Sequence, residues 1–105
     1  MEFKEYAVMM KALGDETRVR IFDMLSGGER CACKLLEEFS ITQPTLSYHM
    51  KILCDCGLVS ARRDGIWMRY SIKQEMLTDL IAFLNGIGAS GLESGEICDC
   101  KGGAA

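Results

Sequence analysis

The chain has 105 residues, of which 49% are apolar and 26% are charged, and its formal net charge is −3. These values are typical of one folded domain and exclude a disordered chain. No apolar run reaches the roughly 18–20 residues that span a bilayer, and the first ten residues contain acids and no cleavable apolar segment. We therefore expect a small cytoplasmic protein that does not associate with membranes.

Three helices are predicted in the first forty residues from the spacing of their apolar side chains. The first runs from Phe3 to Leu13. The second follows the capping residue Asp15 and ends at Leu25, before a Ser-Gly-Gly stop. The third is a short helix from about Cys31 to Phe39.

The second half of the chain predicts a helix, a hairpin and a last helix. The fourth helix follows Thr42, a good N-cap, with Pro44 in its first turn and Gly57 as its stop. Two alternating segments, LVSARR and IWMRYSI, flank an Asp-Gly turn, which is typical of a β-hairpin. The last helix is expected from about Gln74 to Ile87.

The predicted fold is mostly α with a small β-hairpin, in the order α-α-α-α-β-β-α. The short turn between the third and fourth helices gives a helix-turn-helix, and the hairpin that follows adds the wing of a winged helix-turn-helix. The first and last helices carry apolar faces wider than one small core requires. We therefore expect a homodimer in which these two helices pair between subunits.

The central third of the chain is basic, although the whole chain is acidic. Residues 42–73 hold five lysines and arginines against two aspartates. A recognition helix presents short hydrogen-bonding side chains to base edges, and hairpin arginines reach phosphates or the minor groove. The only histidine is expected to serve structure or a phosphate rather than a metal. The candidate DNA contacts are Gln43, Thr45, Ser47, Tyr48 and His49 in the fourth helix, with Arg62 and Arg63 in the hairpin.

These elements divide the chain into two parts. We assign residues 1–88 to a winged helix-turn-helix domain for DNA binding and dimerisation. Residues 89–105, rich in glycine and serine, are predicted to form a flexible C-terminal tail that contains cysteines.

Cysteine is the strongest signal in the composition. Because no secretory signal is expected, the thiols should stay reduced, and clustered reduced thiols indicate soft-metal binding or redox chemistry. The six cysteines form three Cys-x-Cys pairs, namely Cys31 with Cys33, Cys54 with Cys56, and Cys98 with Cys100.

Several segments together resemble the ArsR/SmtB family of metal-responsive repressors, in its arsenic-responsive type. They are ALGDETRVRI, ERCACKL, TQPTLSYHMKIL and GLVSARRDGIWMRYSI, within about residues 8–72. The resemblance implies a homodimeric winged helix that occupies operator DNA when metal-free and leaves when an inducer binds. It places Gln43, Thr45, Ser47 and His49 at recognition-helix positions that contact DNA, and Arg62, Arg63 and Gly65 in the wing.

The same resemblance assigns the inducer site. Cys31 and Cys33 match the Cys-x-Cys that opens the helix before the recognition helix in members that respond to arsenic, antimony, cadmium or lead. The arsenic-type pattern often has a third cysteine where this chain has Leu36. We expect the tail to supply that ligand through Cys98 or Cys100, since residues i and i+2 of an extended segment point the same way. The expected inducer is As(III) or Sb(III), with no organic cofactor.

Helix geometry suggests a switch. Residues i and i+2 of a regular helix lie roughly 200° apart, so Cys31 and Cys33 would grip one ion only by unwinding the turn. That distortion would reach the recognition helix. For Cys54 and Cys56 we weigh two alternatives, partly buried free thiols and a second metal site.

Other functions remain as alternatives. A Cd(II)- or Pb(II)-responsive repressor and a thiol-redox repressor fit the same fold. A cysteine-rich metal buffer or chaperone explains the thiols but leaves the basic hairpin without a role. A zinc site on the last helix is disfavoured, because Glu75 and Asp79 have no histidine near them. We predict no enzyme, because no nucleophile–base pair is visible.

Overall fold

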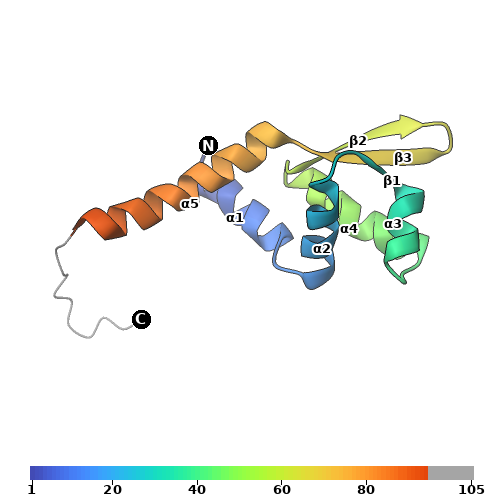
Figure 1. Cartoon of the computed structure of the whole chain (residues 1–105), viewed down its shortest axis with the longest axis horizontal. Coiled ribbons are helices and arrows are strands. Elements are labelled where there is room, and N and C mark those ends of the chain that lie inside the picture. Colours follow the sequence, from blue (N-terminus) through green and yellow to red (C-terminus); the bar gives the residue numbers. More distant parts are fainter. Residues whose placement is uncertain (95–105) are drawn as a thin grey trace.

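The computed structural model describes the backbone of residues 1–94 and the side chains of residues 1–89. Its order of elements confirms the mostly α winged helix-turn-helix with a β-hairpin wing (Figure 1). The elements are α1 (Phe3–Ala12), α2 (Glu16–Leu25), β1 (Arg30–Cys31), α3 (Ala32–Glu38), α4 (Gln43–Asp55), β2 (Val59–Asp64), β3 (Trp67–Ile72) and α5 (Gln74–Ser94).

The predicted helix starts in the helix-turn-helix are confirmed. The Asp15 side chain caps α2 by accepting a hydrogen bond from the Arg18 backbone N–H, and Thr42 caps α4 in the same way through Thr45. Each cap satisfies a backbone donor that the helix itself leaves without a partner. The capping residues therefore fix where α2 and α4 begin.

The third helix starts one residue later than predicted, because an unpredicted strand precedes it. Residues Arg30 and Cys31 form β1, which pairs antiparallel with β3 and places Cys31 opposite Arg69. Cys31 is the N-cap of α3, in an extended conformation with φ −76° and ψ 146°. A two-residue strand is too short to show alternation, so its partner strand, and not its own sequence, defines it.

The last helix is longer than predicted. It continues to Ser94 rather than ending near Ile87. Residues 88–94 are rich in small side chains but contain no proline, so nothing removes a donor from the helical hydrogen bonds. The division of the chain at residue 88 stays a prediction, and residues 95–105, with Cys98 and Cys100, lie outside the described residues.

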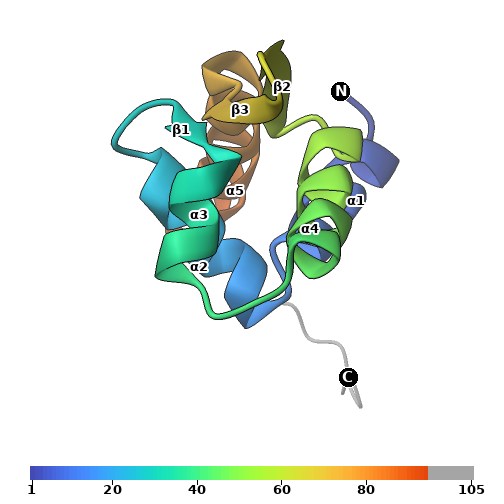
Figure 2. The same ribbon diagram turned by 90° about the vertical axis from the view of Figure 1, so that its right-hand side faces the viewer.

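The hydrophobic core lies between the first four helices and the sheet. Viewed end-on in Figure 2, α2 and α3 lie on one side and α1 and α4 on the other, with the strands across the top. The sheet has the order β1-β3-β2. The largest fully buried side chains are Met9, Ile21, Leu35, Leu46, Met50, Leu53, Leu58 and Val59. This packing holds α4 and the hairpin in one rigid arrangement.

Helices α1 and α5 leave apolar side chains uncovered. Phe83 of α5 stacks on Tyr6 of α1 with ring centroids 4.1 Å apart, which holds the two helices together. Phe3 is nevertheless 79% exposed and Ile87 58% exposed, while Ile81 of α5 is also exposed. An apolar patch of this kind is typical of a subunit interface. No helix within residues 1–94 is long and apolar enough to cross a membrane.

Candidate thiol site and nucleic-acid interface

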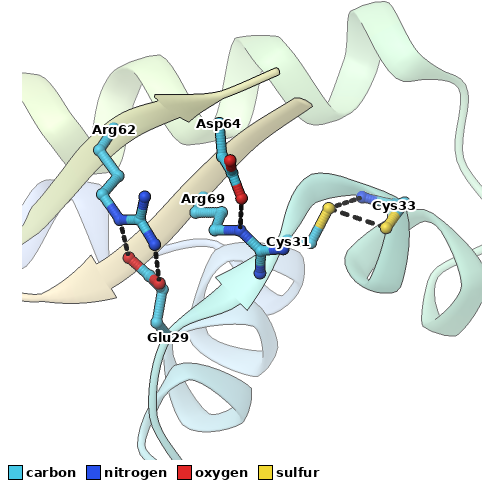
Figure 3. Close-up of polar contacts among 6 residues, drawn as sticks. All are labelled: Glu29, Cys31, Cys33, Arg62, Asp64 and Arg69. Carbon is cyan, nitrogen blue, oxygen red and sulfur yellow. Dashed lines mark hydrogen bonds and ion pairs between the residues drawn. The ribbon is translucent and has the colours of Figure 1, made fainter. Parts of the chain in front are cut away.

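Cys31 and Cys33 form a close thiol pair at the start of α3. The Cys33 thiol donates a hydrogen bond to Cys31 Sγ across 2.8 Å, and the Cys33 backbone N–H donates to the same sulfur at 3.4 Å (Figure 3). Both side chains are partly exposed. The two sulfurs are therefore already on one side of the chain and open to a ligand.

This geometry corrects the expected conflict between the thiol pair and the helix. The prediction that α3 must unwind assumed that both cysteines are helical. Cys31 instead precedes the helix in an extended conformation, and only Cys33 lies in the first turn. The pair can therefore chelate an ion without breaking the helix.

The two thiols of this pair differ in pKa. The hydrogen bond from Cys33 lowers the pKa of Cys31, and its backbone N–H and the nearby Arg69 act in the same direction, against desolvation. The same bond to Cys31, together with desolvation, raises the pKa of Cys33. The first thiolate therefore forms on Cys31, and this form binds soft metals.

No third ligand lies beside this pair in the described part of the chain. Within it, no three His, Cys, Asp or Glu side chains are arranged to hold a metal ion. Leu36, where the resemblance would place a third cysteine, is partly buried and packs against the core. Cys98 and Cys100, the predicted source of that ligand, lie outside the described residues.

Cys54 and Cys56 have the burial expected of structural thiols. Cys54 is half-buried, while Cys56 is buried and its thiol donates to the Leu53 carbonyl at 3.2 Å. Desolvation raises the pKa of both thiols. They are therefore poorer metal ligands than Cys31 at neutral pH.

The start of α4 presents the predicted recognition residues to solvent. Gln43, Thr45 and Ser47 are exposed, and Tyr48 is 62% exposed. Leu46, Met50 and Leu53 on the opposite side are buried in the core. The helix thus presents a polar face that is free to contact a ligand.

His49 has an internal partner that the sequence analysis missed. The Arg18 guanidinium lies 3.1 Å from His49 Nδ1, and Arg18 Nε donates to the Ala12 carbonyl at 2.6 Å. Because a guanidinium only donates, Nδ1 is the acceptor in this contact. Arg18 therefore links the end of α1 and the start of α2 to the recognition helix α4.

The wing carries two ion pairs that the sequence analysis also missed. Arg62 binds Glu29 through two hydrogen bonds of 2.9 Å each, and Arg69 Nε donates to Asp64 Oδ2 at 2.6 Å (Figure 3). These arginines lower the pKa of Glu29 and of Asp64. Arg63 is exposed and makes no ion pair with any residue of 1–89.

The tip of the wing is open. Gly65 has φ +69°, the left-handed conformation that the predicted Asp-Gly turn requires. The next residue, Ile66, is 85% exposed. The hairpin thus ends in a protruding turn, with Arg63 close to it.

Comparison with known proteins identifies the class of regulator. The family model described as "Bacterial regulatory protein, arsR family" matches residues 15–61. An arsenical resistance operon repressor from Staphylococcus aureus is 46% identical over 101 residues, which are 96% of this chain and 93% of that protein. A cadmium resistance transcriptional regulatory protein homologue from Staphylococcus aureus is 34% identical, over 77% of this chain and 69% of that protein.

A solved structure gives the same fold. The homodimeric winged helix-turn-helix DNA-binding domain of a possible ArsR-family regulator from Mycobacterium bovis has a TM-score of 0.67 and 29% sequence identity. The structural match covers 90% of this chain and 88% of that domain. All these relatives are regulators, which agrees with the prediction that the chain is not an enzyme.

Proposed function

Because the chain belongs to the arsR family of bacterial regulatory proteins, we propose that it is a metalloid-responsive repressor. It binds operator DNA as a homodimer in the cytoplasm and leaves when As(III) or Sb(III) binds its thiolates. The observation that carries this proposal is the Cys31–Cys33 pair, whose sulfurs lie 2.8 Å apart at the start of α3, the helix that precedes the recognition helix α4. Soft thiolates select thiophilic ions over hard cations.

The operator contacts are proposed on the polar face of α4 and on the wing. Exposed hydrogen-bonding groups on this face come from Gln43, Thr45, Ser47 and Tyr48. His49 follows them in α4 and is hydrogen-bonded to Arg18. In the wing the proposed contacts are Arg62, Arg63 and the turn at Gly65. Arg63 is the cation there with no acidic partner in residues 1–89, so it is available to phosphates.

Dimerisation is proposed through α1 and α5, which leave Phe3, Ile81 and Ile87 exposed. A two-fold dimer presents two α4 helices to two half-sites of an operator. The relative from Mycobacterium bovis is a homodimer of the same fold. Residues 1–88 would then bind DNA and dimerise, while residues 89–105 carry further thiols.

The third arsenic ligand is proposed to be Cys98 or Cys100. Pyramidal As(III) takes three thiolates, and the pair at Cys31 and Cys33 supplies two. Cys54 and Cys56 are poorer candidates, since burial raises the pKa of both.

A Cd(II)- or Pb(II)-responsive repressor is the second candidate. The cadmium resistance regulator homologue at 34% identity favours it, and thiolates bind these ions as well. The two candidates share the fold and the operator contacts, so only the inducer separates them.

The experiment uses the full chain and labelled DNA from upstream of its own gene. The wild-type protein should bind that DNA and leave it on addition of arsenite or antimonite, with little response to Cd(II), Pb(II) or Zn(II). Cys31→Ser, Cys33→Ser should bind the DNA yet stay bound with arsenite. The matched control, Cys54→Ser, Cys56→Ser, should be released nearly as the wild type is.

Two results would contradict the proposal. Failure of the wild type to bind its upstream DNA would remove the repressor function. Release by Cd(II) or Pb(II) but not by arsenite would support the repressor function and show that the inducer is one of these ions instead of As(III).

A further inference from the structure

Arg62 of the wing is held by a carboxylate from outside the hairpin. Glu29 directly precedes β1 at one edge of the sheet, while Arg62 lies on β2 at the other edge. Two hydrogen bonds of 2.9 Å join them, from Arg62 Nε to Glu29 Oε2 and from Arg62 Nη2 to Glu29 Oε1 (Figure 3). The pair therefore bridges the sheet over the middle strand, β3.

The geometry of this contact is the one by which arginine binds a phosphate. A guanidinium offers two parallel N–H groups that fit two oxygens of either a carboxylate or a phosphate. Glu29 occupies both of these donors. A backbone phosphate of DNA can use this edge of the guanidinium only by displacing the Glu29 carboxylate.

The loop before β1 fixes Glu29 in this position. Gly28 has φ +122°, a conformation that residues with a Cβ rarely adopt. The Arg30 guanidinium turns back and donates to the carbonyls of Gly28 at 3.4 Å and of Glu29 at 3.1 Å. After Glu29 the chain enters β1, where Arg30 lies opposite Tyr70 of β3. Because its backbone is held on both sides, Glu29 loses less freedom on binding Arg62 than a carboxylate on a mobile loop would.

Glu29 changes the charge that the wing presents to DNA. Residues 59–72 carry three arginines and one aspartate, a net charge of +2, which the Glu29 carboxylate reduces to +1. Asp64 already binds Arg69. The Arg62 side chain is nevertheless 58% exposed, so a phosphate can reach the pair and compete for it.

On the basis of the proposed function, we propose that Glu29 is an internal competitor of the DNA backbone for Arg62. Its carboxylate occupies the donors that a phosphate would use and so weakens the contact of Arg62 with DNA. Phosphate contacts carry no direct information about base sequence. Glu29 therefore limits the affinity of the repressor for DNA of any sequence and leaves base recognition to α4. It is a positioning residue and not a DNA contact.

Such a limit suits a repressor that has to leave its operator. An inducer changes DNA affinity by a factor of roughly 5 to 150. This factor vacates the operator only if the inducer-free protein does not bind DNA far more tightly than its concentration requires. A wing that gripped phosphates through every arginine would reduce the release.

The test is a double-mutant cycle of Glu29→Gln and Arg62→Met, measured on the upstream DNA and on unrelated DNA without inducer. Glu29→Gln keeps the size of the side chain and removes its charge. It should bind both DNAs at least about fourfold more tightly than the wild type at 50 mM NaCl, because one phosphate contact is strengthened. The slope of log K against log salt should become steeper by about 0.9, so this advantage should shrink about 3.5-fold between 50 and 200 mM NaCl.

The Arg62→Met background provides the control. If Glu29 acts through Arg62, Glu29→Gln should leave the slope unchanged in this background and gain little affinity. The general loss of one negative charge near DNA would instead act equally in both backgrounds. Glu29→Asp keeps the charge on a side chain one methylene shorter and should lie between the wild type and Glu29→Gln. Thermal unfolding of each variant checks that the fold is intact.

The outcomes separate the competition from the repressor function. If the wild type prefers its upstream DNA but Glu29→Gln binds no more tightly, or gains the same factor in both backgrounds, the competition is wrong and the repressor function stands. Weaker binding by a stably folded Glu29→Gln would also overturn the competition and show that the pair shapes the wing for DNA. If the wild type does not prefer its upstream DNA, the proposed function fails, while the salt slopes on unrelated DNA still measure the effect of Glu29.

Discussion

The guanidinium of Arg18 lies 3.1 Å from His49 Nδ1 and so joins α2 to the recognition helix. The same side chain donates to the Ala12 carbonyl at the end of α1. Three helices thus meet at one arginine. The angle at which α4 presents its polar face depends on this link as well as on the core beneath it.

Arg18→Ala should therefore loosen α4. A hydrogen bond that involves a charged group is worth about 1.5–3 kcal/mol when buried, and Arg18 is only half-buried. We expect the free energy of unfolding to fall by about 1–2 kcal/mol and operator affinity to fall with it. Urea unfolding and DNA titration measure the two effects. His49→Gln keeps an acceptor and should lose less stability and less operator affinity. Wild-type stability and affinity of Arg18→Ala would show that the link between Arg18 and His49 does not position α4.

The helix residues should set sequence discrimination. Ser47→Ala or Gln43→Ala should each weaken binding to the operator by roughly 1–3 kcal/mol, with little effect on unrelated DNA, if each contacts a base. Both side chains are exposed on α4, so their removal leaves the core intact, and thermal unfolding provides the control. Equal weakening on operator and unrelated DNA would mean that these residues contact the backbone.

The two adjacent wing arginines should behave differently. Arg63→Ala should weaken binding to all sequences and reduce the slope of log K against log salt by about 1, because one phosphate contact is lost. Arg62→Ala should change both quantities less, since its guanidinium is held by Glu29 through two bonds. Titration over a range of NaCl concentrations measures the slopes. Identical slopes for the two variants would show that Arg62 leaves Glu29 when DNA binds.

The local signals in the sequence predicted the fold well, and its long-range pairings poorly. Asp15 and Thr42 cap helices through bonds to residues three positions on, so a short window of sequence contains the whole motif. Strand β1 forms because it pairs with β3, which lies about forty residues later in the chain. The spacing of apolar residues around β1 contains no signal of this pairing. The misplacement of Cys31 within a helix followed from this.

The candidate site shows the same division. The identity of the thiol pair was evident from Cys31 and Cys33 themselves, whereas their geometry depended on β1. The pairing of Arg62 with Glu29 spans 33 residues. A count of charges along the chain therefore did not show that Arg62 has an acidic partner. The partners of the predicted site residues, rather than those residues themselves, were what the sequence left out.

The difference in pKa between Cys31 and Cys33 predicts that their reactivities depend differently on pH. The pKa of Cys31 lies below that of an ordinary thiol because Cys33 donates a hydrogen bond to it, and the pKa of Cys33 lies above. As pH falls, Cys31 keeps its thiolate longest, so its alkylation by iodoacetamide should persist to lower pH than that of Cys33. Peptide mass spectrometry measures both rates. Cys33→Ala removes the donor and should move the profile of Cys31 to higher pH, and coincident profiles in the wild type would contradict this assignment.

The third arsenic ligand is expected to come from the tail, at Cys98 or Cys100. Cys98→Ser, Cys100→Ser should bind operator DNA as the wild type does but need at least about tenfold more arsenite for release, since tenfold corresponds to only 1.4 kcal/mol of lost binding. Cys31 and Cys33 still supply two thiolates, so the response weakens and does not vanish. Alkylation with and without arsenite should show that arsenite protects three thiols in the wild type and two in the variant, not counting a thiol such as Cys56 that burial protects in both conditions. Each single variant should keep three protected thiols if the two tail cysteines substitute for one another. Release of the double variant at the wild-type arsenite concentration, with only Cys31 and Cys33 protected in both proteins, would show that the thiol pair at α3 senses arsenite without the tail.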